Sequence, residues 1–249
     1  MGDPPRLYGL KALVLNGGGG IGEAVARTLT KHGAKVLAVD KPGNGAERHF
    51  ASVKGIDGYS AGLTDAGKIP AIVEHAAEHL GGIDILVNEF PLQPDAPISA
   101  VDAEFDRLLK ARADLTLTAC RSALPHLKKS PAGRIINMGF LRSTFAVDGE
   151  EPFARAERDL AAMTRALAAE CGDFGILANY VQPGAIMTPA SREVFRKHKK
   201  LRDYCIASSA ASRVGEPVDV AKVVLFLASD DAMFISGTGI AVNGGWTAG

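Results

Sequence analysis

The 249-residue sequence carries no net charge, because its 28 basic residues are balanced by 28 acidic ones. A chain without a basic excess has no long-range field to attract nucleic acid or an anionic membrane, so we expect neither partner. Its longest strongly apolar run, residues 223–228, is far too short to cross a bilayer. The first eleven residues hold two prolines beside an arginine and no apolar stretch, so we do not expect a signal peptide.

Cysteine is equally scarce. Cys120, Cys171 and Cys205 are odd in number, widely spaced and form no C-x-x-C pair, so we expect reduced thiols in a cytoplasmic protein. His75 and His79 stand at the H-x-x-E-H spacing of some zinc enzymes, but no third ligand accompanies them. We interpret the two histidines as part of a solvated helix face and expect no metal.

Short apolar runs alternate with helical patterns along the whole chain. We expect strands at residues 12–15, 36–39, 56–63, 85–87, 134–137, 176–181 and 239–242. Helices are expected at residues 20–32, 64–80, 101–128, 152–174, 191–212 and 216–229. Strands joined by helical crossovers run parallel, so the pattern predicts one α/β domain over residues 1–249. Its doubly wound parallel sheet has about seven strands and carries helices on both faces.

A cluster of glycines follows the first expected strand. Asn16 precedes Gly17–Gly20, and Ile21 and Gly22 then begin the first expected helix. Glycine lets the backbone come close to a pyrophosphate, which is then bound by the helix N-terminus. Asp40 ends the second strand 18 residues after Gly22, where an acid can bond a ribose 2′-hydroxyl and favour NAD over NADP. The loop predicts a dinucleotide site, and a tight turn kept only for packing is the alternative.

Several segments together resemble the classical branch of the short-chain dehydrogenase/reductase (SDR) family. They are residues 20–22 (Gly-Ile-Gly), 83–88 (Ile-Asp-Ile-Leu-Val-Asn), 105–107 (Phe-Asp-Arg), 123–126 (Ala-Leu-Pro-His), 133–137 (Gly-Arg-Ile-Ile-Asn), 183–184 (Pro-Gly), 213–217 (Arg-Val-Gly-Glu-Pro) and 237–246. The resemblance covers the whole chain and implies a Rossmann-type fold with a basic substrate lid at about residues 186–212. It also implies carbonyl reduction or alcohol oxidation with NAD(P), and a dimer or tetramer.

Members of this family use an Asn, a Ser, a Tyr and a Lys for catalysis. The Tyr is the general acid and base, the Lys lowers its pKa, the Ser orients the carbonyl and the Asn anchors a water relay. In an ungapped comparison these positions hold Arg112, Phe140, Phe153 and Glu157. Phenylalanine has no proton to give, and no change of register restores the motif, because none of the four tyrosines precedes a lysine by four residues. We therefore assign no catalytic residue.

The resemblance also implies the residues that contact the cofactor. They are Asn16, Gly18, Gly20, Ile21, Gly22, Asp40, Leu63, Asn88, Pro183, Gly184, Ile186 and Thr188. Several family positions are altered, since Asn16 replaces a glycine, Gly62 replaces an adenine-contacting Asp, and residues 89–91 (Glu-Phe-Pro) replace Asn-Ala-Gly. NAD binding, favoured over NADP by Asp40, and weak or lost cofactor binding are therefore both open.

The four substitutions in the catalytic set make physical sense together. The Asn and Lys positions lie near each other in the family fold, so we expect Arg112 and Glu157 to form an ion pair. Phe140 and Phe153 are expected to pack together and fill the former active site. The alternative is unrelated drift, in which each side chain points its own way.

These substitutions favour a pseudoenzyme that serves as a ligand-binding or oligomerisation module. Such a protein forms a homo-oligomer or pairs with a catalytic SDR subunit. The alternative is an NAD-dependent oxidoreductase that uses non-standard groups, such as Glu150, Glu151 or a water. A lyase like the halohydrin dehalogenases is excluded, because that class keeps a Ser-Tyr-Arg set. The basic run at residues 196–202 fits an acidic ligand, such as a CoA phosphate or an acidic carrier protein, or else a solvated lid face.

Overall fold

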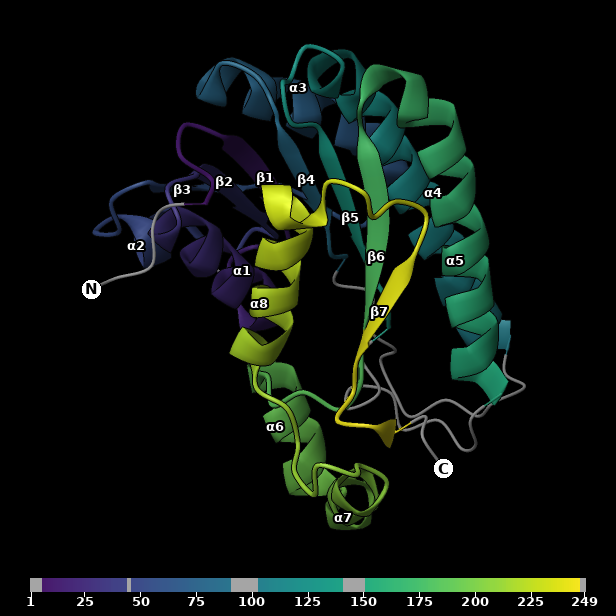
Figure 1. Ribbon diagram of the computed structural model, residues 1–249. Helices are drawn as coiled ribbons and strands as arrows, with labels where there is room; N and C mark the ends of the chain where they lie inside the picture. Colours follow the sequence, from purple (N-terminus) through teal and green to yellow (C-terminus); the bar gives the residue numbers. More distant parts are fainter. Residues whose placement is uncertain (1–5, 44–45, 91–102, 141–150, 247–249) are drawn as a thin grey trace.

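The computed structural model describes residues 6–43, 46–90, 103–140 and 151–246, with the side chains of residues 103, 104 and 151–153 left out. In this part of the chain seven parallel strands form one sheet in the order β3-β2-β1-β4-β5-β6-β7 (Figure 1). The order reverses between β1 and β4, where doubly wound sheets bind ligands. The expected fold class is confirmed.

The element bounds place most of the chain in regular structure. The strands are β1 (Lys11–Leu15), β2 (Lys35–Asp40), β3 (Ile56–Ser60), β4 (Ile85–Asn88), β5 (Arg134–Met138), β6 (Leu177–Pro183) and β7 (Gly239–Val242). The helices are α1 (Gly20–Lys31), α2 (Ala46–Phe50), α3 (Ile69–Leu80), α4 (Ala103–Leu127), α5 (Glu151–Cys171), α6 (Pro189–Lys197), α7 (Lys199–Ala207) and α8 (Pro217–Ala228). Short 3₁₀ turns cover Ala66–Lys68, Gly172–Phe174 and Asp230–Ala232.

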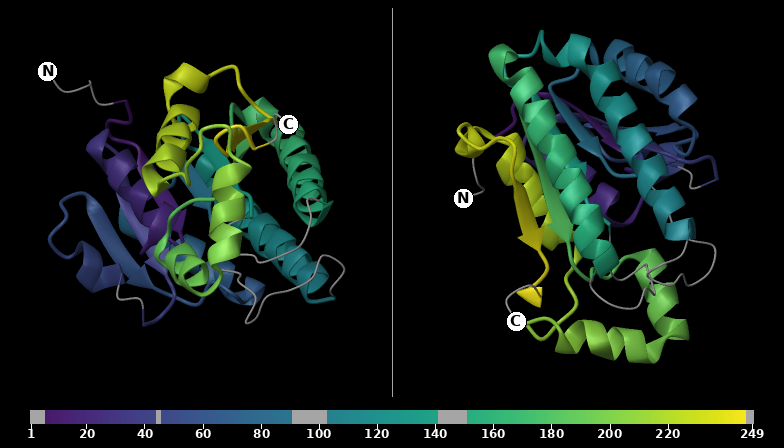
Figure 2. Two further views of the ribbon diagram at one scale, coloured as in Figure 1. Left: turned by 90° about the horizontal axis from the view of Figure 1, so that it is seen from below. Right: turned by 90° about the vertical axis from the view of Figure 1, so that its right-hand side faces the viewer.

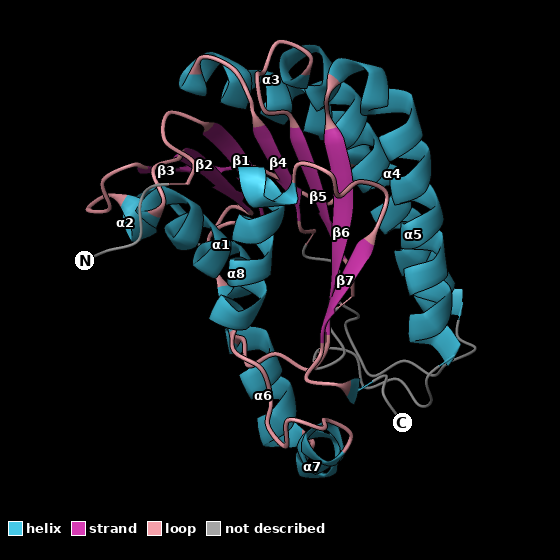
Figure 3. Ribbon diagram, viewed as in Figure 1, coloured by secondary structure: helices cyan, strands magenta, loops and turns pink. Residues whose placement is uncertain are grey.

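Helices cover both faces of the sheet (Figure 3). Helices α1 and α8 lie side by side on one face, where Val25 and Val224 pack with Val14. Helices α3, α4 and α5 cover the other face, where Val73 packs with Leu13. Successive strand side chains point to opposite faces, so a strand buried on both sides must be apolar throughout. This explains the unbroken apolar runs within β1, β2 and β4, whereas the edge strands β3 and β7 are partly exposed.

The structure differs from the expected elements at three places. Helix α2 was not predicted, because five residues are too few to show a helical period. The expected helix at residues 191–212 is two helices, separated at His198, whose backbone (φ −123°, ψ 72°) is not helical. The third strand ends at Ser60, and α3 is preceded by a 3₁₀ turn that the side chain of Asp65 caps through the amide of Gly67. The sequence around these boundaries is charged and only weakly apolar, so its apolar pattern does not show where the elements begin and end.

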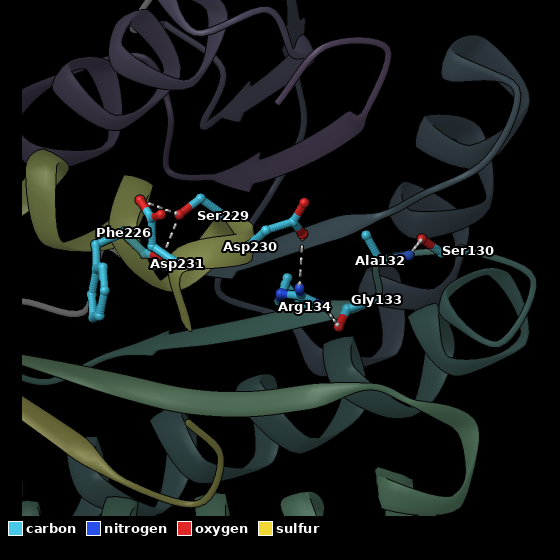
Figure 4. Close-up of polar contacts among 8 residues, drawn as sticks. All are labelled: Ser130, Ala132, Gly133, Arg134, Phe226, Ser229, Asp230 and Asp231. Carbon is cyan, nitrogen blue, oxygen red and sulfur yellow. Dashed lines mark hydrogen bonds and ion pairs between the residues drawn. The ribbon is translucent and has the colours of Figure 1, made fainter. Parts of the chain in front are cut away.

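Helices α6 and α7 extend beyond the carboxyl ends of the strands, as the views from below and from the side show (Figure 2). The opposite end of the sheet is closed by polar contacts around Arg134 (Figure 4). Its Nη1 donates to the carbonyl of Gly133 at 3.1 Å, and its Nη2 lies 3.8 Å from Oδ1 of Asp230. The Oγ of Ser229 donates to the carbonyl of Phe226 at 2.9 Å. Arg134 therefore belongs to the amino end of the sheet and not to the functional site.

Other expectations concern cysteine, metal and membrane. Cys120, Cys171 and Cys205 are buried, and no disulfide joins any two of them. His79 lies 2.9 Å from Oδ2 of Asp57, and the ring of His75 stacks on Tyr59 at 4.1 Å. Within the described residues no group of His, Cys, Asp and Glu is placed to hold a metal ion. The helices described include none that is long and apolar enough to traverse a bilayer.

Candidate active site

The glycine loop between β1 and α1 folds tightly against its surroundings. Asn16 adopts a left-handed conformation (φ 60°), as does Gly20 (φ 54°). A Cβ on Gly22 would overlap the carbonyl oxygen of Asn16, and one on Gly17 would lie 2.8 Å from the Cβ of Ala38. Asparagine tolerates a positive φ better than most residues, which explains how it stands in for the glycine of the family. The loop therefore keeps the backbone path that the sequence predicts.

Asp40 lies beside this loop at the end of β2. It is buried, its Oδ1 accepts a hydrogen bond from the amide of Lys41 at 2.6 Å, and a Cβ on Gly18 would overlap its carboxylate. A bare backbone beside a buried carboxylate is the arrangement that a dinucleotide ribose and its phosphates require. The structure thus brings together Gly18 and Asp40, two residues that the sequence analysis selected.

Glu89 is a further acidic residue in this region, and it was not among the predicted contact residues. It follows β4 and accepts hydrogen bonds from the amide of Gly22 and from the side chain of Asn16. Its other oxygen, Oε2, is buried and has no hydrogen-bond donor among the described residues. Burial raises the pKa of Glu89 to about 8, and nearby Asp40 adds to the rise while Arg112 opposes it. The signal was present in the sequence, as an acid in the family's Asn-Asn-Ala-Gly segment.

Arg112 on α4 lies at the carboxyl end of β5. Its Nη2 donates to the carbonyls of Met138 (2.5 Å) and Gly139 (3.2 Å), and its Cζ lies 4.5 Å from the ring centroid of Phe140. Burial lowers the pKa of Arg112 to about 10, and Glu89 is the acidic group that opposes this shift. A cation therefore occupies the position of the family's catalytic Asn, with main-chain acceptors and an aromatic ring around it.

The expected ion pair between Arg112 and Glu157 is not formed, so this prediction is wrong. No ion pair joins the two side chains in the described part of the chain. The guanidinium is held by the end of β5 and has Glu89 as its charged partner. Glu157 instead accepts a hydrogen bond from the hydroxyl of Tyr180. Burial raises the pKa of Tyr180, and the charge of Glu157 raises it further.

Phe140 is buried, as expected, and its packing against Phe153 stays a prediction. Its ring centroid lies 5.7 Å from that of Phe105, and the side chain of Phe153 lies outside the described residues. Phe140 and Arg112 line a mostly apolar cavity of about 120 Å³ between α4 and α5. Ligand pockets usually measure about 300 Å³ or more, so this cavity is too small for a cofactor. The side chains of Glu150 and Glu151, and residue Pro91, also lie outside the description.

The remaining predicted contact residues divide into core and loop. Ile21 and Leu63 are buried in the two hydrophobic layers. Asn88 is buried too, and its amide donates to Oδ1 of Asn137 at 2.9 Å, which links β4 to β5. These three side chains are committed to the core, so any contact they make with a cofactor stays a prediction.

The loop after β6 approaches the glycine loop. Thr188 caps α6 by accepting a hydrogen bond from the amide of Ser191 at 3.1 Å, and a Cβ on Gly20 would lie 3.4 Å from Thr188. Ile186 pairs with Gly215 in an isolated parallel bridge. After Pro183, the last residue of β6, Gly184 packs closely on Asn243. The start of the lid thus lies against the glycine loop, although the two segments are far apart in sequence.

Comparison with characterised proteins identifies relatives along nearly the whole chain. The 3-oxoacyl-[acyl-carrier-protein] reductase FabG of Pseudomonas aeruginosa is 33% identical over 246 residues, covering 96% of this chain and 98% of the relative. The reductase MabA of Mycobacterium bovis, which has the same activity in its name, is 31% identical over 98% of this chain and 95% of its own length. FabG of Vibrio cholerae is 30% identical over 96% and 98%, respectively.

These relatives correct the function expected from the substituted catalytic positions. Those positions favoured a pseudoenzyme, whereas the chains that match from end to end are named as reductases. The pseudoenzyme interpretation weighed four side chains more heavily than the rest of the sequence, and it is wrong. The oxidoreductase alternative agrees better with the comparisons.

The family assignment rests on a match that also covers nearly the whole chain. A family model described as Enoyl-(Acyl carrier protein) reductase matches residues 17–247. The matched region includes the glycine loop, the sheet, the lid and β7. The chain therefore belongs to the short-chain dehydrogenase/reductase family.

Proposed function

We propose that this protein is a nicotinamide-dependent oxidoreductase that interconverts a carbonyl and an alcohol, with 3-oxoacyl thioesters as its substrate class. The observation that carries the proposal is the end-to-end similarity to chains named 3-oxoacyl-[acyl-carrier-protein] reductases. The glycine loop beside the buried Asp40 supports it, because a dinucleotide needs this arrangement.

The residues present fit the adenosine half of the cofactor. A Cβ on Gly18 would overlap the carboxylate of Asp40 and one on Gly22 would overlap the carbonyl oxygen of Asn16, so only glycine lets the loop backbone lie this close to both groups. The backbone of this loop would hold the phosphates, and Asp40 would bond the ribose and disfavour a 2′-phosphate, which favours NAD. Residues 183–188 would face the nicotinamide. When bound, the nicotinamide supplies or accepts a hydride.

Arg112 is the residue we assign to polarise the substrate carbonyl. Negative charge develops on the carbonyl oxygen as the hydride arrives, and a fixed cation stabilises that charge in a site shielded from water. The guanidinium lies beside Phe140, which replaces the family's Ser. Its several N–H donors allow it to bond Met138 and Gly139 and still present a donor to substrate. With Phe153 at the position of the Tyr, water supplies the proton.

The lid carries a charge pattern that suits an acidic carrier protein. Residues 192–202 hold six Arg or Lys residues and one acidic residue, Glu193. Arg196 and Lys197 pair with Glu193, at 2.8 and 3.3 Å. Lys199 and Lys200 begin α7, are exposed and are not paired within the described residues. This surface supports a thioester substrate presented on an acidic protein, because opposite charges steer association.

Reversing charges on the lid is expected to raise the KM for a substrate on a carrier protein but not for the same acyl group on a small thiol. In Lys199→Glu/Lys200→Glu, the KM for a 3-oxoacyl group on an acyl carrier protein is expected to rise about tenfold, while the KM for the same group on pantetheine stays unchanged. Lys35→Glu/Lys54→Glu is the matched control, because these lysines are also exposed but follow α1 and α2, away from the lid. Equal KM values for wild type and lid variant would remove the carrier protein from the proposal.

A turnover assay tests the proposed reaction itself. The protein is mixed with 3-oxobutyryl-pantetheine and either NADH or NADPH, and cofactor oxidation is followed together with the 3-hydroxy product. We expect substrate-dependent oxidation, faster with NADH, at a rate about 10²- to 10⁴-fold below that of a relative with an intact general acid. Neither cofactor being oxidised above the rate of buffer alone would overturn the proposed function.

A further inference from the structure

The N-terminus of α1 already has a carboxyl group of the protein's own, that of Glu89. The first amides of a helix point outward with a partial positive charge, which is why phosphates bind there. In this chain the amide of Gly22, the third residue of α1, donates to the carboxylate of Glu89, and the side chain of Asn16 donates to it as well. A dinucleotide bound at the glycine loop, as the proposed function requires, would place its phosphates at the same helix end.

The surroundings of Glu89 do not neutralise its charge well. Among the described residues, two charged groups act on it, Arg112 from α4 and Asp40 from the end of β2. They have opposite signs, and Arg112 lies beyond the 4.0 Å reach of an ion pair with Glu89. Oε2 is buried and no described residue donates to it. A second anion at this end would therefore meet a poorly compensated carboxylate in a medium of low dielectric constant.

We propose that Glu89 is an internal competitor for the cofactor phosphates, and that a dinucleotide binds only as this carboxylate takes up one proton from solvent. The proton goes to Oε2, the oxygen without a donor, while the other oxygen keeps its hydrogen bond from Gly22. The neutral acid no longer repels the phosphates, and its new O–H becomes a donor. Charge and protons balance, because well above the pKa of Glu89 one solvent proton is bound for each cofactor bound, and below that pKa the proton is already in place.

Titration with NADH at several pH values tests the coupling. With a free-protein pKa of about 8, the neutral fraction of Glu89 falls about tenfold between pH 7 and pH 9, so NADH should bind wild type about tenfold more weakly at pH 9. Glu89→Gln keeps the shape and cannot ionise, so its Kd should change less than about twofold over this range. Glu78→Gln, an exposed acid on α3, is the matched control and should follow wild type.

A second readout needs no cofactor. The pKa of Glu89 in the folded protein lies above its ordinary value of 4.5, so the protonated side chain favours the folded state. That stability is present below about pH 4.5 and is lost as pH rises towards 8. The urea midpoint of wild type should therefore fall between about pH 5 and pH 8 relative to that of Glu89→Gln. Should Glu89→Gln fail to fold, Glu89→Asn, which restores the family residue, replaces it.

The outcomes separate this inference from the proposed function on which it rests. A pH-dependent Kd in wild type and a flat one in Glu89→Gln support the coupling. Parallel profiles in the two proteins overturn the coupling and leave the oxidoreductase intact. Failure of both proteins to bind NADH or NADPH at any pH overturns the proposed function, and the role of Glu89 as a competitor fails with it, whatever the urea midpoints show.

Discussion

Gly22→Ala is expected to lower the free energy of unfolding by about 3 kcal/mol and to weaken NADH binding about 100-fold. The added Cβ would overlap the carbonyl oxygen of Asn16 and lie 2.9 Å from the Cα of Gly17. Both neighbours are backbone and cannot rotate aside. Helix α1 must therefore move away from the loop, and its N-terminal amides move with it. Urea unfolding and NADH fluorescence titration measure the two effects.

Gly19→Ala is the matched control for Gly22→Ala. Gly19 lies in the same loop with an extended backbone (φ −165°), and a Cβ there has no atom within 4 Å. Because Gly19 is the N-cap of α1, its replacement by Ala should lower the free energy of unfolding by at most about 1 kcal/mol. Its NADH affinity should stay within a few-fold of wild type. Equal stability and affinity in the two variants would show that close packing at Gly22 does not shape the site.

Arg112→Met is expected to cost about 3 kcal/mol of stability and to abolish turnover. The buried carbonyls of Met138 and Gly139 lose their donor, and Glu89 loses its cationic neighbour. Methionine keeps much of the volume, so a cavity does not explain the loss. Arg121→Met on the exposed face of α4 should change stability by less than about 0.5 kcal/mol. Equal urea midpoints for these two variants would contradict the assigned contacts.

A double-mutant cycle of Glu89→Gln with Arg112→Met should measure a coupling free energy that depends on the charge of Glu89. At about pH 9, where Glu89 is ionised, Arg112→Met combined with Glu89→Gln should cost about 1 kcal/mol less than the sum of the single changes. At about pH 6 Glu89 is neutral and the coupling should vanish. Removing the cation should also raise the pKa of Glu89, and with it the pH at which NADH binding weakens. A coupling free energy of zero at both pH values would contradict electrostatic coupling between the two side chains.

The centre of the sheet could be predicted because β1, β2 and β4 are buried on both faces, which requires a short unbroken apolar run in each. Helix α2 and the break at His198 could not, since neither interrupts an apolar pattern. The glycine loop and Asp40 were predictable for a local reason, because turn, helix start and acid follow one another within one strand-helix-strand unit. Contacts between residues far apart in sequence depend on how the elements pack. The sequence therefore predicts local features well and such long-range contacts poorly.

Arg112, Glu89 and Glu157 show that difficulty. Positions that adjoin in the family fold predicted a pair between Arg112 and Glu157, but a side chain bonds the nearest suitable group. For Arg112 that group is the main chain at the end of β5, and for Glu157 it is the hydroxyl of Tyr180. Glu89 was noted only as a departure from the family segment. Its contact with Gly22 becomes evident when β4 and α1 are placed in space.

Transfer of deuterium tests the central claim most directly. The protein is incubated with 3-oxobutyryl-pantetheine and NADH carrying deuterium at the transferable position of the nicotinamide, and the product is analysed by mass spectrometry. A nicotinamide-dependent reductase predicts a 3-hydroxybutyryl product with one deuterium on C3, lost in Arg112→Met and retained in Arg121→Met. A product without deuterium, or no product at all in wild type, would contradict hydride transfer by this protein.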